Sequence, residues 1–211
     1  GVLYVTSTAA GPAFEGAGIS CGCGSVSGAI DRVWLEEGKL RIHTIHEAKA
    51  VGICGSGLID AIAAGLKNGE IDETGALEDD TLSLTEGVAI EQKDIRSVQL
   101  AKAAIAAGIE TLLETAGTTV EEIGTLYITG GFGSHLNVES AVEIGLLPKG
   151  IEDRTRVLGN AALAGVSRVL LDQREKQELS RIAGLSKHVN LGGNAVFNEK
   201  YVNNMFLGND F

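Results

Sequence analysis

The sequence predicts an α/β fold in which a mixed sheet is flanked by helices, and three observations support this prediction. Short runs of β-forming residues alternate with longer segments whose apolar residues recur at helical spacing. Glycine is frequent at 29 residues, proline occurs twice and aromatic residues make up 4%, which suits helices packed closely on a sheet through small residues. With 211 residues, 44% of them hydrophobic, the chain can bury a core without disulfides.

The order of the expected elements follows from these spacings and from residues that start or stop helices. Ser56, Asn160 and Asn194 are suitable N-cap residues, and Gly117 favours the end of a long amphipathic helix. Residues 69–87 are polar and turn-rich, which predicts a surface excursion. The remaining expectations, in chain order, are a strand at 2–8, a glycine-rich connection at 9–22, a hairpin of strands 29–35 and 40–45, a helix at 92–116, a strand at 126–129, a helix at 138–147, a strand at 156–158, helices at 160–171 and 173–183, a strand at 188–191 and a terminal helix.

Charge, apolar content and cysteine content limit the partners and the cellular compartment that we expect. The formal net charge of −11 repels phosphate backbones and anionic lipid headgroups, so we expect neither a nucleic-acid nor a membrane partner. No apolar run is long enough to span a bilayer. Cys21, Cys23 and Cys54 are an odd number of cysteines without a disulfide framework, which predicts a reducing cytoplasm.

The stretch L-Y-I-T-G-G-F-G-S-H, residues 126–135, is the strongest candidate for a binding site. A strand runs into Gly130, Gly131, Phe132 and Gly133, and ligands of open α/β sheets often bind where strands end. Glycines there let main-chain N–H groups approach a flat or charged ligand, because no Cβ intervenes. The alternative is a tight turn that lets a helix pack on its strand.

Three further segments allow both a structural and a ligand-binding interpretation. Gln99 and Lys102 are three residues apart on one helical face, beside alanines that leave room for a flat ring, although solvated polar residues also fit this pattern. The helix start at 158–165 is rich in Ala and Gly, which suits ordinary packing or a thin helix between two moving lobes. The loop at 10–16, which ends at Gly16, passes close to other backbone under either interpretation.

Taken together, these segments resemble the second, ribonuclease-H-like lobe of the acetate-and-sugar-kinase, heat-shock-chaperone and actin superfamily of ATPases. T-S-T-A-A-G-P-A-F-E-G resembles the strand and loop after that lobe's phosphate-binding hairpin. I-T-G-G-F-G resembles the adenosine motif, and G-N-A-A-L-A-G resembles the second connecting helix. Together with G-I-C-G-S-G-L-I-D-A-I and Q-K-D-I-R-S-V-Q-L-A-K-A-A-I, they are similar to the C-terminal domain of the reductive activators of corrinoid proteins.

This resemblance implies that the parent protein couples ATP and Mg²⁺ to the reduction of Co(II) to Co(I) in a corrinoid protein of methyl-transfer metabolism. It also implies a [2Fe–2S] domain elsewhere in the parent chain and allows a homodimer. Gly130, Gly131 and Gly133 would then lie against the ribose and α-phosphate, with an open trough running from them toward Lys102. Gln99 and Lys102 would meet the adenosine, Gly16 would approach the phosphates, and Phe132 would pack beneath the loop.

Several parts of the superfamily pattern are missing from the sequence, and they limit what the chain does alone. It opens within a strand pattern and without methionine, so we expect residues 1–211 to be one domain, the second lobe of a longer protein. The phosphate loop and the acidic hairpin of the superfamily are not found, so we expect no catalytic residue and no ATP hydrolysis by this lobe alone. The cysteines lack the four-thiolate pattern of a cluster, and His43 and His46 lack zinc spacing, which predicts no metal site.

Two other functions stay open at this point. One is a lobe of a small-molecule kinase of the same superfamily, which would need a catalytic carboxylate facing a substrate pocket. The other is a non-catalytic docking or dimerisation module, in which the apolar residues of the terminal helix cover the core or a partner.

Overall fold

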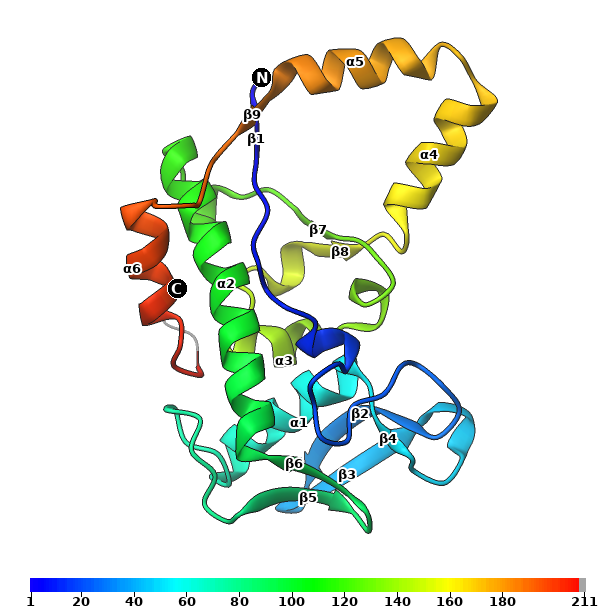
Figure 1. Ribbon diagram of the computed structural model, residues 1–211, viewed down its shortest axis with the longest axis vertical. Coiled ribbons are helices and arrows are strands. Elements are labelled where there is room, and N and C mark those ends of the chain that lie inside the picture. Colours follow the sequence, from blue (N-terminus) through cyan, green and yellow to red (C-terminus); the bar gives the residue numbers. More distant parts are fainter. Residues whose placement is uncertain (209–211) are drawn as a thin grey trace.

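The computed structural model describes residues 1–208, and its elements follow the expected order of an early meander and then alternating helices and strands (Figure 1). Their bounds are β1 Leu3–Val5, β2 Ala29–Glu36, β3 Lys39–Thr44, β4 Gly52–Ile53, α1 Gly55–Asn68, β5 Thr81–Thr85, β6 Val88–Glu91, α2 Gln92–Ala116, β7 Leu126–Ile128, α3 Val138–Glu143, β8 Thr155–Val157, α4 Ala161–Leu171, α5 Glu175–Leu185, β9 Ser186–His188 and α6 Ala195–Asn203. Short 3₁₀ turns lie at Ala13–Glu15, Ile45–Glu47, Val120–Glu122, Gly133–His135 and Glu152–Arg154.

The strands form four small sheets rather than one continuous ladder. In the largest sheet β2 pairs with β3 antiparallel and with β4 parallel. The strands β5 and β6 form an antiparallel hairpin, whereas β7–β8 and β1–β9 are parallel pairs. Parallel pairing requires a crossover connection, and α3 lies in the segment between β7 and β8. The mixture of parallel and antiparallel pairs, covered by helices, confirms the predicted mixed α/β class.

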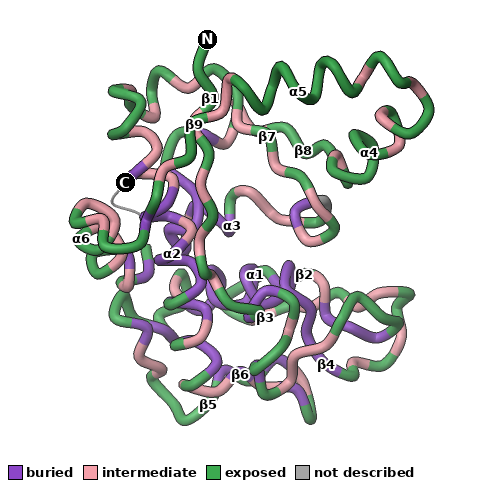
Figure 2. Tube along the Cα trace, turned by 45° about the horizontal axis from the view of Figure 1, so that its top comes forward, coloured by how far each residue is buried: buried purple, intermediate pink, exposed green. Residues whose placement is uncertain are grey.

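The core lies between α1, α2 and the sheet of β2–β4 (Figure 2). Most of α1 is buried, including Ile59 and Ile62. Alanines along α2 are also buried, and their small side chains let neighbouring backbones approach closely. Helix α6 packs along α2, where Glu110 accepts a hydrogen bond from Asn204 Nδ2 at 2.6 Å and pairs with Lys200 at 2.9 Å. The chain therefore folds its C-terminal helix back onto its longest helix.

Two expectations about local structure are wrong. Residues 69–87 are not only a surface excursion, because β5 falls within them and its Leu82 and Leu84 are buried in the core. Ser56 is not an N-cap, since α1 begins at Gly55, two residues earlier than that cap predicts, and Cys54 is its N-cap. The Ser56 hydroxyl instead donates to the main-chain oxygen of Asp31 at 3.1 Å, so this side chain ties α1 to β2.

The N-caps expected at the two later helices are confirmed. Asn160 accepts a hydrogen bond from the Leu163 amide at 3.0 Å, and Asn194 accepts one from the Phe197 amide at 3.2 Å.

Helices α4 and α5 extend away from the body as an arm, and α5 leads back into β9 beside β1 (Figure 1). No helix within residues 1–208 is both long and apolar enough to cross a membrane.

Candidate functional site

The glycine loop after β7 is open at its first two residues and packed at its last. Gly130 has φ +106° and donates its N–H to the Gly159 oxygen at 2.8 Å, which joins the ends of β7 and β8. Among the described residues, no atom lies within 4 Å of where a Cβ would stand on Gly130 or Gly131. A Cβ on Gly133 would lie 2.5 Å from the Ile128 side chain. The Cβ side of Gly130 and Gly131 therefore borders open space, whereas Gly133 serves packing.

Phe132 stacks on Phe14, a residue more than a hundred positions earlier in the sequence. The two rings are 5.3 Å apart between centroids and inclined by 10°. Gly55, the first residue of α1, fits tightly behind them, since a Cβ there would lie 1.9 Å from the Phe14 oxygen and 2.8 Å from the Phe132 ring. This aromatic pair fixes the glycine loop against the start of α1.

A hollow of about 230 Å³ opens beside this aromatic pair. Its walls come from the glycine loop, the start of α1 and the loop before β2, and they include Gly131, Phe132, Glu15, Ser56 and His135. Ser56 and His135 also line a neighbouring, more polar hollow of about 550 Å³ that reaches Asp31, Arg32 and Asp60. The start of α1 was not among the predicted site residues, although the glycines of G-I-C-G-S-G were a signal for close backbone approach.

Asp60 is the buried acid of the second hollow. Burial raises the pKa of its carboxyl, and this shift is partly offset by Ser140, by the Val33 N–H that donates at 3.3 Å and by the charge of Arg32. The side chain therefore links α1 to β2 at the base of a polar hollow.

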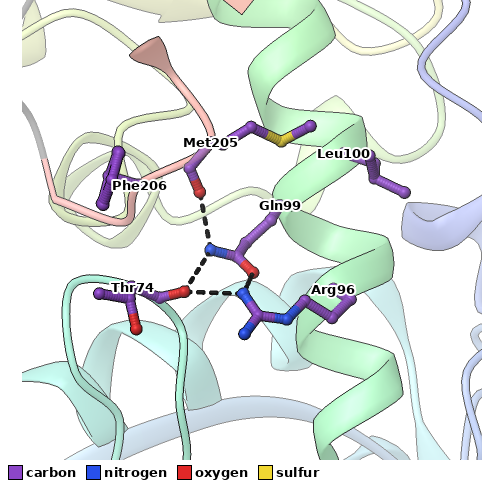
Figure 3. Close-up of a pocket in the computed structure, with 6 residues that line it drawn as sticks. All are labelled: Thr74, Arg96, Gln99, Leu100, Met205 and Phe206. Carbon is purple, nitrogen blue, oxygen red and sulfur yellow. Dashed lines mark hydrogen bonds between the residues drawn. The ribbon is translucent and has the colours of Figure 1, made fainter. Parts of the chain in front are cut away.

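Gln99, predicted to meet the adenosine, is held by the protein itself (Figure 3). Its Nε2 donates to the main-chain oxygens of Thr74 at 2.9 Å and Met205 at 2.7 Å. Its Oε1 accepts from Arg96 Nη1 at 2.6 Å, and that nitrogen also donates to Thr74 O at 2.8 Å. This network lines a separate hollow of about 590 Å³, whose walls are completed by Leu100 and Phe206. The structure therefore does not bring Gln99 to the glycine loop.

Lys102, the second residue predicted on that face, is only 1% exposed. Its Nζ lies 3.5 Å from the Gly145 oxygen. A Cβ on Gly145 would lie 2.9 Å from that Nζ and 2.3 Å from the Gly208 oxygen, so all three groups are tightly packed. The expected open trough toward Lys102 is not seen in the part of the chain that the structure describes, and a nucleotide contact by Lys102 stays a prediction.

Gly16 approaches other backbone closely, as its position in the loop suggested. It has φ +80°, and a Cβ there would lie 2.9 Å from the N and O atoms of Cys23. Both the left-handed conformation and this contact require glycine. The close approach is to the protein's own chain, and the predicted approach to phosphates is untested.

The helix that resembles a connecting helix begins directly beside the glycine loop. The Gly159 oxygen receives the Gly130 N–H, and Asn160 then caps α4. Ala162 and Gly165 face a hollow of about 640 Å³ between α4 and α5, together with Leu179 and Ile182. A main-chain hydrogen bond therefore joins the glycine loop to the segment that starts this helix.

The side chains that could act as metal ligands do not cluster in the described part of the structure. Residues 1–208 contain no group of three or more His, Cys, Asp or Glu side chains with the geometry to hold a metal ion. His43 Nδ1 instead lies 2.7 Å from Asp31 Oδ1 on the strand surface. Of the cysteines, Cys54 is buried, whereas Cys21 and Cys23 are half-buried.

Comparisons with known proteins agree with this fold. The sequence model of one family, described as "C-terminal domain of RACo the ASKHA domain", matches residues 1–210. The chain is 35% identical to "Corrinoid activation enzyme RamQ" of Eubacterium limosum, over 98% of the chain and 40% of the relative. It is 29% identical to "[Co(II) methylated amine-specific corrinoid protein] reductase" of Methanosarcina barkeri, over 95% of the chain and 41% of the relative.

A solved structure gives the same result at the level of coordinates. The "Reductive activator for corrinoid,iron-sulfur protein" superposes with a TM-score of 0.86 at 33% identity, over 96% of this chain and 36% of that one. The fold is thus an actin-like ATPase lobe of the ASKHA class. Within that class the chain belongs to the family of C-terminal domains of corrinoid reductive activators. It spans about two fifths of the length of the curated relatives.

Proposed function

We propose that this chain is the nucleotide-binding lobe of an ATP-dependent reductive activator that restores Co(I) in a corrinoid protein. The observation that carries the proposal is the empty space at the Cβ positions of Gly130 and Gly131, in a loop that Gly130 joins to the start of α4 and in a chain of this family. The names of the relatives support the corrinoid protein as partner. The proposal places the parent protein in the cytoplasm, as the three free cysteines favour.

The residues around the loop suit ATP with Mg²⁺. Because no side chain fills the space at Gly130 and Gly131, a ribose and α-phosphate can lie on their main chain. Bound ATP supplies the free energy for an electron transfer that is otherwise uphill. The groups that position Mg²⁺ and the γ-phosphate belong, in this proposal, to the other lobe of the parent, so this chain alone does not hydrolyse ATP.

The other predicted contacts form the second part of the proposal. Gln99 and Lys102 reach the adenosine only if the segment at 205–208, which covers them, moves aside. Gly16 contributes by holding the segment of Cys23 at the edge of the hollow. The [2Fe–2S] cluster lies outside this chain, because Cys21, Cys23 and Cys54 do not supply four thiolates.

The arm of α4 and α5 is the proposed route from nucleotide to partner. Lobe closure on ATP would move the Gly130–Gly159 contact and hence α4, whose Ala162 and Gly165 leave its surface thin. The exposed leucines of this arm also favour the second candidate, a docking or homodimerisation surface. Sedimentation of the parent chain and of its Leu171→Glu variant distinguishes a homodimerisation surface on the arm from a route between nucleotide and partner.

The proposed nucleotide site is tested by a side chain placed in the open space of the loop. In the full-length parent, Gly131→Val should weaken ATP binding by about tenfold or more, because the new methyl groups occupy ligand space. Gly124→Val is the matched control, since Gly124 is also an exposed loop glycine with nothing within 4 Å of its Cβ position among the described residues.

The measurement is calorimetric titration with ATP and Mg²⁺, with thermal unfolding to verify the fold of each variant. Equal ATP affinity of a folded Gly131→Val protein and the parent would refute the proposed site. Turnover of ATP by the 211-residue chain alone would contradict the assignment as a single lobe.

A further inference from the structure

Two cysteines lie next to each other on chain segments that run in parallel. Gly22 and Ile53 form a parallel bridge, the Cys23 N–H donates to Ile53 O at 2.9 Å, and the Ile53 N–H donates to Cys21 O at 2.8 Å. Cys23 directly follows Gly22, and Cys54 directly follows Ile53, so the two cysteines are the next pair along the bridged segments. Since side chains alternate between faces along both segments, the two thiols are neighbours on the same face.

The surroundings hold both thiols at the hollow beside Phe132. Cys23 and Cys54 both line this hollow of about 230 Å³. Cys54 is 5% exposed at the N-cap of α1, with its Sγ 3.3 Å from Ser56 Oγ, whereas Cys23 is half-buried. A Cβ on Gly52 would lie 2.9 Å from Cys23 Sγ, so a glycine beside this thiol leaves it room. The two sulfurs thus share one solvent-reachable space.

We propose that Cys23 and Cys54 are an oxidation site that forms a reversible disulfide when the protein meets hydrogen peroxide. The Cys23 thiolate attacks one peroxide oxygen, the O–O bond breaks, and a sulfenic acid and water form after proton uptake. The Cys54 sulfur then attacks the Cys23 sulfur and displaces the hydroxyl as a second water. In sum, two thiols and one peroxide give one disulfide and two waters, and a dithiol reductant reverses the change.

The order of attack follows from exposure. Cys23 is the more exposed thiol and meets the oxidant first, whereas the buried Cys54 reacts second. Burial and the nearby Cys54 raise the pKa of Cys23, so the reaction should accelerate as the pH rises. Burial, with the charge of Asp94, raises the pKa of Cys21 to about 11, which keeps this third thiol protonated and less reactive.

The test is peptide mapping of the 211-residue chain after treatment with equimolar hydrogen peroxide, and it does not depend on nucleotide binding. Free thiols are alkylated, the chain is digested without reductant, and the fragments are identified by mass spectrometry. We expect a cross-linked pair of peptides joining Cys23 to Cys54, two hydrogen atoms lighter than their sum, in the parent and in the matched control Cys21→Ser. In Cys54→Ser the reaction should stop at a sulfenic acid on Cys23, which dimedone traps.

Several results would overturn the proposal. They are three alkylated thiols after peroxide treatment, a cross-link that uses Cys21, or a disulfide found only between two chains. Loss of the cross-link in Cys21→Ser would likewise contradict it, since that residue has no part in the proposed bond.

Discussion

Helix α1 of the body and helix α4 of the arm are of similar apolar character but opposite burial (Figure 2). In α1, Leu58, Ile59 and Ile62 are at most 1% exposed. In α4, Leu170 and Leu171 are 75% and 88% exposed, and no residue of the helix is buried. Apolar helix faces are stable when another element covers them. The body covers the apolar residues of α1, whereas the arm leaves those of α4 exposed.

The largest expected effect comes from removing a core side chain of the body. Ile62→Ala should lower the free energy of unfolding by about 2–5 kcal/mol, because Ile62 is fully buried and the loss leaves a cavity. The matched change in the arm, Leu171→Ala, should alter it by less than about 0.5 kcal/mol. Urea unfolding of both variants measures the difference. Similar losses for the two would show that the arm is buried in solution and would remove the contrast.

A smaller effect on stability is expected from the titration of one acidic side chain in each region. Burial raises the pKa of Asp60 in the body above its usual value of 3.8, whereas Arg181 lowers the pKa of the exposed Glu178 in the arm. Between pH 3.8 and its raised pKa, folded Asp60 keeps a proton that the unfolded chain has released. Stability should therefore fall as the pH rises through this window, with a slope of at most about 1.4 kcal/mol per pH unit.

Asp60→Asn tests this sign, because the amide oxygen can still accept from the Val33 N–H. The variant should lose less stability than the parent between about pH 4 and neutral pH, as measured by urea unfolding across that range. Glu178→Gln is the control and should leave the pH profile nearly unchanged, since exposed ion pairs contribute little. An unchanged pH profile in Asp60→Asn would contradict the account of this buried acid.

The elements that could be predicted from the sequence are those whose signals are local. Helix α2 spans 92–116 as expected, because its apolar stripe is continuous and Gly117 ends it with φ +66°. The strand β5 was missed because the turn residues around it outweighed the alternation of Leu82 and Leu84. Local signals therefore define helices better than short buried strands.

The candidate site could be predicted only in part, since it is built from contacts across the sequence. No described atom lies within 4 Å of the Cβ positions of Gly130 and Gly131, and a nucleotide contact there stays a prediction. The stack of Phe132 on Phe14 and the cover over Lys102 bring together segments far apart in the chain, which spacing alone does not reveal. A sequence alone does not show whether a polar residue is exposed or buried. Gln99 and Lys102 are both buried.

Hydrogen–deuterium exchange of the full-length parent, with and without ATP and Mg²⁺, shows whether nucleotide lies on the main chain of Gly130–Gly131. We expect slower exchange with ATP in the peptide that covers 129–133, and we expect Gly131→Val to abolish this protection. Protection confined to the segments around Gln99 and Met205, with the glycine loop unchanged, would contradict it.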